Sequence, residues 1–132
     1  MRKGDWETAL SDYLAGAGEY SYGSNDCMLF AAGAVKVQTG RDFARGHRRK
    51  YKSAIGAGRY LLSLGFDCPA DMIASLLEEK PVAFAQRGDI VLVRDDAGQE
   101  IPGVCYGEIA LILVEDGLGR VPRDRWLKAW AV

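Results

Sequence analysis

Apolar side chains recur at helical spacing through the first half of the chain. Four of them lie on one face of a helix that we predict for residues 5–15: Trp6, Leu10, Tyr13 and Leu14. Residues 27–38 are mostly small or apolar, which indicates a second helix that is buried on more than one side. We expect the first helix to pack against the second. Two shorter helices follow, one over residues 60–64 and one around residues 72–77 that ends before Pro81.

After the last helix, the spacing of the apolar residues changes. Short runs rich in β-branched and apolar residues predict strands at residues 89–93, 101–106 and 109–114. A turn at residues 95–98 joins the first two strands, and Gly117 and Gly119 mark another turn. The closing residues 126–132 form either a helical turn or a strand, with Trp130 pointing inward. Helices followed by an antiparallel sheet define an α+β fold.

The composition fits a single domain spanning residues 1–132. With 132 residues, 48% of them hydrophobic, the chain can bury a core, and no repeat, low-complexity segment or linker divides it. The 17 basic and 18 acidic residues give a formal net charge of −1, so the overall charge favours neither nucleic acid nor an anionic membrane as partner. We expect no secretory signal and no membrane span, because no long apolar run occurs anywhere in the sequence.

One segment is locally basic. Residues 41–52 contain a single acidic residue, Asp42, and seven basic ones: Arg41, Arg45, His47, Arg48, Arg49, Lys50 and Lys52. Such a run is most often a solvated face, and its only aromatic residues are Phe43 and Tyr51, so nucleic acid ranks low as a partner. A docking patch in an assembly is the functional alternative, because a local cluster of charge can steer a protein partner.

The three cysteines, Cys27, Cys68 and Cys105, are an odd number and lack the spacing of a zinc site. A chain of this size does not depend on disulfides, so we expect reduced thiols, with Cys68 and Cys105 buried as small apolar residues. The acidic residues around the 95–98 turn serve its backbone. We therefore predict neither a metal site nor another cofactor.

Cys27 stands apart because a turn-rich segment and a capping residue precede it. Asn25 or Asp26 can accept a hydrogen bond from the first helical turn, which places Cys27 at the N-terminus of the predicted helix. The free backbone N–H groups and the helix dipole favour thiolate over thiol there, and the thiolate is the nucleophile. The commoner alternative is a small apolar residue that begins a buried helix.

Three short motifs resemble the NlpC/p60 group of papain-like cysteine peptidases, which cut the peptide stems of bacterial cell wall. In chain order they are Tyr22-Gly23, Asp26-Cys27 and Gly88-Asp89. The resemblance implies a papain-like architecture, with N-terminal helices followed by a small antiparallel sheet. It also implies Cys27 as the nucleophile, Tyr22 and Asp26 as the frame of the site, and peptidoglycan stem peptides as the substrate class.

A further set of residues is similar to an uncharacterised family found in tailed phages and prophages. The set comprises Asn25-Asp26-Cys27, Thr39-Gly40-Arg41-Asp42, Arg45-Gly46 with Tyr51, and Ala129-Trp130. Genes of that family lie among those for the tail tip, so the resemblance implies a component of the tail tip or baseplate. Its partners would be other phage tail proteins of the hub or tip. It would be made in the bacterial cytoplasm without a signal peptide and carried in the virion tail.

The catalytic base of these peptidases has no counterpart in this sequence. In those enzymes a histidine opens the strand after the Gly-Asp strand, because imidazole can take the thiol proton near neutral pH and return it to the leaving amine. We assign that position to Glu108, which follows Gly107. A carboxylate of reference pKa about 4.3 is a poor base for a thiol of about 8.5. The only histidine, His47, lies in the basic segment, where we expect a solvated and neutral loop side chain.

Three functions therefore stay open. The first is a structural tail-tip component that has an NlpC/p60-like fold and is inactive as a peptidase because the catalytic histidine has been replaced. The second is an active murein endopeptidase or amidase, in which Cys27 acts with an unconventional base. The third is a binding module that holds a peptide in the inherited cleft without cutting it. The side chain that lies within about 4 Å of the Cys27 sulfur decides among them, because geometry selects a base before its pKa does.

Overall fold

The computed structural model describes residues 1–132 as four α-helices followed by one six-stranded antiparallel sheet, so the predicted α+β class is confirmed. The helices are α1 (Trp6–Ala15), α2 (Cys27–Thr39), α3 (Ala54–Ser63) and α4 (Pro69–Leu76). The strands are β1 (Glu79–Lys80), β2 (Ile90–Arg94), β3 (Glu100–Tyr106), β4 (Ile109–Val114), β5 (Gly117–Pro122) and β6 (Trp126–Trp130). Single 3₁₀ turns precede β2 and β6, namely η1 (Val82–Phe84) and η2 (Arg123–Arg125).

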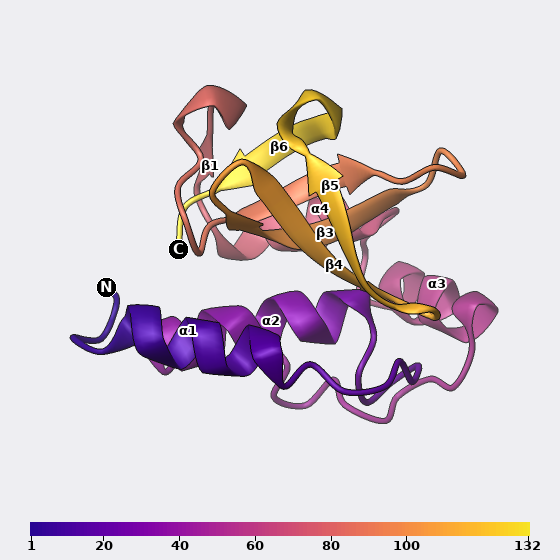
Figure 1. Ribbon diagram of the computed structural model, residues 1–132. Coiled ribbons are helices and arrows are strands. Elements are labelled where there is room, and N and C mark those ends of the chain that lie inside the picture. Colours follow the sequence, from indigo (N-terminus) through magenta and orange to yellow (C-terminus); the bar gives the residue numbers. More distant parts are fainter.

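The strands lie in the order β1-β6-β2-β3-β4-β5, so β2 to β5 form consecutive hairpins and β6 returns to pair with the other side of β2. Helices α1 and α2 run side by side along one face of the curved sheet (Figure 1). The two helices are antiparallel, since the amide of Lys3 donates to the carbonyl of Gln38. None of the helices combines the length and the hydropathy that a membrane crossing requires.

Both faces of β2 are buried, which explains its unbroken apolar sequence. Successive strand residues point to opposite faces, so Ile90 and Leu92 pack towards the helices with the central Phe30. Val91 and Val93 belong to a second apolar cluster on the opposite face of the sheet. A strand buried on both faces reads as a continuous apolar run rather than as an alternating one.

Close packing of α1 on α2, which the sequence predicts, depends on Gly33. A Cβ atom at Gly33 would overlap the hydroxyl of Tyr13. That hydroxyl donates a 2.8 Å hydrogen bond to the carbonyl of Phe30, and the two rings stack with centroids 5.6 Å apart. The glycine therefore lets the tyrosine ring lie directly on the central helix.

Several predicted boundaries are wrong. Helix α3 begins at Ala54 rather than at residue 60, because the Ser53 side chain caps it by accepting a 3.0 Å hydrogen bond from the Gly56 amide. Gly117 and Gly119 lie in strand β5, where full pairing with β4 outweighs the low strand propensity of glycine. Of the two alternatives for residues 126–132, the strand is confirmed at Trp126–Trp130, whereas β1 and the two 3₁₀ turns were not predicted.

Candidate functional site

The carboxylate of Asp26 organises the segment before α2. Its Oδ1 accepts a 3.0 Å hydrogen bond from the amide of Leu29, which caps the helix, so the capping residue is Asp26 and not Asn25. Its Oδ2 accepts from the amide of Gly23 at 2.9 Å and from the hydroxyl of Tyr51 at 2.5 Å. One buried carboxylate thus joins α2, the turn before it and the end of the basic segment at residues 41–52, which we call the basic loop.

The Tyr22-Gly23 pair fits this frame for steric reasons. Gly23 has a φ of +84°, and a Cβ atom there would overlap the carbonyl oxygen of Tyr51. The Gly23 carbonyl accepts a 2.8 Å hydrogen bond from the amide of Arg49, which holds the basic loop against the turn. The hydroxyl of Tyr22 donates to Glu115 at 3.0 Å and so links the turn to the β4–β5 hairpin.

Cys27 is the first residue of α2, as predicted, but its thiol is not activated. The pKa of Cys27 is raised from 9.0 to about 12, chiefly by burial and next by the charge of the adjacent Asp26. The N–H groups of Met28 and Cys27 and a hydrogen bond from Tyr20 lower the pKa without compensating for these effects. Desolvation and the charge of Asp26 together outweigh the helix terminus, so this environment disfavours the thiolate.

A cavity of about 150 Å³ borders Cys27 and extends between α2, α3, α4 and the basic loop. Aliphatic and aromatic side chains from these elements form most of its wall. Six further residues bring polar groups to this wall: Tyr20, Tyr22, Asp26, His47, Tyr51 and Tyr60. The cavity is thus mainly apolar, and four tyrosines contribute to its wall.

His47 lines this cavity, which corrects the prediction of a solvated loop side chain. Its Nδ1 lies 2.6 Å from the hydroxyl of Tyr60, and the two rings meet edge to face with centroids 5.8 Å apart. His47 makes no hydrogen bond to Cys27. The basic loop therefore turns its histidine inwards while its arginines face solvent.

The structure does not bring Glu108 to Cys27. Glu108 lies in the β3–β4 turn with 90% of its side chain exposed, and its Oε2 is 3.6 Å from the Nε of Arg123. It does not line the cavity. The strand that follows β2 is β3, which begins with Glu100 and Ile101, whereas Glu108 precedes β4. Glu108 therefore takes no part in the surroundings of Cys27 in this structure.

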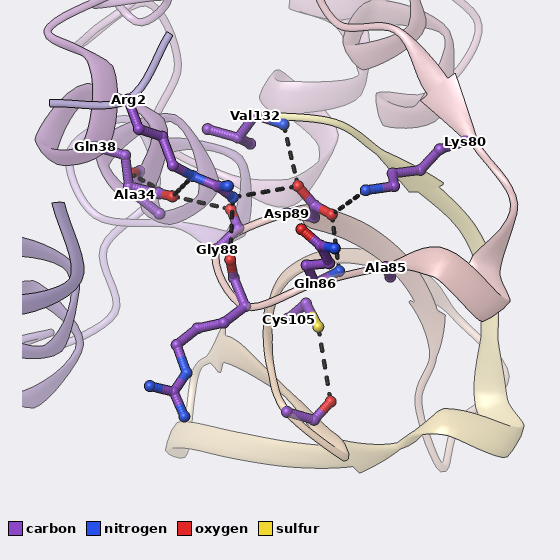
Figure 2. Close-up of polar contacts among 12 residues, drawn as sticks. Arg2, Ala34, Gln38, Lys80, Ala85, Gln86, Gly88, Asp89, Cys105 and Val132 are labelled. Carbon is purple, nitrogen blue, oxygen red and sulfur yellow. Dashed lines mark hydrogen bonds and ion pairs between the residues drawn. The ribbon is translucent and has the colours of Figure 1, made fainter.

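The Gly88-Asp89 motif has a structural role of its own (Figure 2). Asp89 is 2% exposed, and its carboxylate lies 2.8 Å from the Nζ of Lys80 and 3.3 Å from the guanidinium of Arg2. The amides of Gln86 and Val132 also donate to it, at 2.8 and 3.2 Å. The buried carboxylate therefore joins both ends of the chain to the start of β2. It does not line the cavity at Cys27.

Gly88 allows α2 to approach the same turn. Its φ is +91°, and a Cβ atom there would overlap the side-chain oxygen of Gln38. The buried Gln38 amide donates to the carbonyls of Gly88 and Ala34 at 2.9 and 3.0 Å, and its oxygen accepts from Arg2 at 2.8 Å. Sequence reasoning missed Gln38, although a glutamine among small and apolar residues of a buried helix was a signal for it.

The other cysteines differ from each other. Cys68 is exposed at the N-terminus of α4, so its predicted burial is wrong, whereas Cys105 is buried as predicted and burial raises the pKa of its thiol. All three cysteines are free. No group of three or more His, Cys, Asp or Glu side chains is arranged to hold a metal ion.

A family model described as Domain of unknown function (DUF6950) matches residues 1–132. The chain belongs to the DUF6950 family. No curated protein matches it. The frame around Asp26, the cavity and the Asp89 network are therefore features of a DUF6950 domain.

The chemistry available in this DUF6950 domain is that of a neutral thiol beside an apolar cavity. Nucleophilic catalysis requires a thiol and a base within hydrogen-bond reach, and no base bonds to Cys27. The carboxylate beside it, Asp26, is occupied by three donors and disfavours the thiolate. The arrangement suits packing or the binding of an apolar group better than proton transfer.

Proposed function

We propose that this DUF6950 domain is an NlpC/p60-like fold that has lost its peptidase chemistry and serves as a structural component of a phage or prophage tail tip. The observation that carries the loss of activity is the environment of Cys27. The residue occupies the head of a buried helix, yet its thiol has a raised pKa of about 12 and no hydrogen-bonded base. A cysteine in this state stays protonated near neutral pH.

The papain-like part of the proposal draws support from the three motifs. Tyr22-Gly23 and Asp26-Cys27 form one hydrogen-bonded frame at the head of α2, and Gly88-Asp89 opens the strand that packs against this helix. The tail part rests on the sequence resemblance alone. Its residues include Tyr51, which bonds Asp26, and Trp130, which is fully buried in the core.

An active cysteine peptidase or amidase is the second candidate, because His47 lines the same cavity as Cys27. The hydroxyl of Tyr60 holds only Nδ1, so to act as a base the imidazole would have to bring Nε2 within hydrogen-bond reach of the sulfur. The binding-module alternative gains no comparable support for a peptide ligand: the cavity suits an apolar group, and the buried Asp26 carboxylate is already occupied by three donors.

Incubation of the purified protein with murein sacculi and with a synthetic stem peptide tests the loss of activity. We expect no product above the level of the Cys27→Ser variant, measured by mass spectrometry of the soluble fragments. A product that disappears in Cys27→Ser would overturn the proposal, and its loss in His47→Gln as well would identify the base. Tyr60→Phe removes the hydroxyl that bonds Nδ1 of His47, and we expect this variant to release no product either.

The location in the tail needs its own measurement. Particles purified from a phage or induced prophage that carries the gene should contain the protein, detected by mass spectrometry and placed at the tail tip by immunogold labelling. Its absence from intact particles would refute the tail assignment without affecting the conclusion on Cys27.

A further inference from the structure

Helix α3 has two apolar faces that point in opposite directions. Its inner face lines the cavity with Ala57, Tyr60 and Leu61. Its outer face presents Ile55 and Leu62, whose side chains are 71% and 60% exposed. No residue of this helix is buried. An amphipathic helix ordinarily has a polar outer face, so the two exposed aliphatic residues are not explained by packing within the domain.

Cations alternate with these aliphatic residues. Ile55, Arg59 and Leu62 follow one another at spacings of four and three residues, which places them on one stripe of α3, and Lys52 lies just before its N-cap Ser53. Both cations are exposed, and neither forms an ion pair within the chain. By contrast, Asp42, the one acidic residue of the neighbouring basic loop, is paired with Arg48 at 2.9 Å. The stripe therefore offers apolar contact and uncompensated positive charge together.

We propose that the outer face of α3, formed by Lys52, Ile55, Arg59 and Leu62, is a docking surface for an acidic amphipathic helix of another protein. Ile55 and Leu62 are seven residues apart, so they lie two turns apart on the same side of the helix. A helix with leucines at that spacing would cover both, and glutamates beside its leucines would face Lys52 and Arg59. The proposal goes beyond the tail assignment and does not depend on it.

A second copy of this chain fits the surface less well. An acidic helix with free apolar residues is required, and the most acidic helix here, α1, buries Leu10 and Leu14 against the rest of the domain. Two exposed aliphatic residues lie two positions from an acidic side chain: Leu118 is in strand β5, and Leu76 is a single exposed leucine at the last position of α4, so neither belongs to an acidic helix with a free apolar face. We therefore assign the surface to a different protein.

The test uses a synthetic peptide of about 18 residues, long enough to form a helix, with leucines at heptad positions and glutamates around them. Titration into isotope-labelled protein, followed by two-dimensional NMR, should shift signals of residues 52–63. The double variant Ile55→Ser with Leu62→Ser should bind about tenfold more weakly, as a loss of about 1.4 kcal/mol corresponds to that factor. Arg59→Glu should weaken binding and reduce its salt dependence.

Two controls keep the result interpretable. Phe84→Ser removes an aromatic side chain that is 68% exposed on η1, outside the proposed surface, and should leave binding unchanged. Thermal melting should show that the α3 variants stay folded, since neither side chain is buried. Equal binding of a peptide with lysine in place of glutamate, shifts outside α3, or the absence of binding would each overturn the proposal. Self-association of the protein alone that is lost in the double variant would assign the face to a second copy instead.

Discussion

The reactivity of Cys27 can be predicted from its environment. Burial and the neighbouring charge of Asp26 raise the pKa of its thiol from 9.0 to about 12. Near pH 8 a thiol of pKa 9 is about 10% thiolate, whereas one of pKa 12 is about 0.01% thiolate, because each pKa unit changes the fraction about tenfold. Since only the thiolate reacts with iodoacetamide, Cys27 should be alkylated about a thousandfold more slowly than a model thiol of pKa 9.

The assay is the rate of alkylation at each cysteine, measured by peptide mass spectrometry between about pH 6 and pH 11. The exposed Cys68 serves as an internal control for reagent access, and a Cys68→Ser background removes its signal when Cys27 is followed alone. The rate at Cys27 should keep rising with pH beyond pH 10. Asp26→Asn keeps an acceptor for the helix cap but removes the charge, so it should increase the rate at Cys27. A rate at Cys27 that exceeds that of the model thiol near pH 7, or that reaches a plateau below pH 8, would refute this reasoning and favour an active peptidase.

Three further predictions concern stability. Asp89→Asn leaves the cations that flank this buried carboxylate without their partner, so the free energy of unfolding in urea should fall by about 3 kcal/mol. Gly33→Ala should cost about 1–3 kcal/mol in the same assay, because the added methyl group displaces the ring of Tyr13. Stability should fall as pH rises from about 9 to 12: the folded state holds Cys27 and Tyr13 protonated with pKa values of about 12, while the unfolded chain loses these protons earlier. The decline, followed by circular dichroism, should be shallower in Cys27→Ser.

Matched substitutions separate these effects from general sensitivity to mutation. Asp96→Asn removes an acidic side chain that pairs with Arg125 at the surface, and it should leave stability nearly unchanged. Gly58→Ala adds a methyl group to α3 where no atom lies within 4 Å, so it should be neutral or stabilising. If either control destabilised as much as its buried counterpart, the structural account of Asp89 or Gly33 would be incorrect.

The sequence by itself determined those features that depend on neighbouring residues. The periods of α1, α2 and α4, the runs of β2 to β4 and the cap before Cys27 all arise from local spacing and local hydrogen bonds. For the same reason the α+β class could be predicted. Helix α3 was recognised only in its second half, because its two glycines, Gly56 and Gly58, weaken the helical pattern over residues 54–59.

Only the tertiary structure decided which distant residues meet. The partners of Asp89 come from residues 2, 80, 86 and 132, and no local pattern connects them. The inward turn of His47 brings it to the hydroxyl of Tyr60, thirteen residues further along the chain. The sequence placed Cys27 at the head of a helix, where a thiolate is favoured. The folded chain partly buries the same residue and sets Asp26 beside it, and desolvation with that charge outweighs the helix terminus.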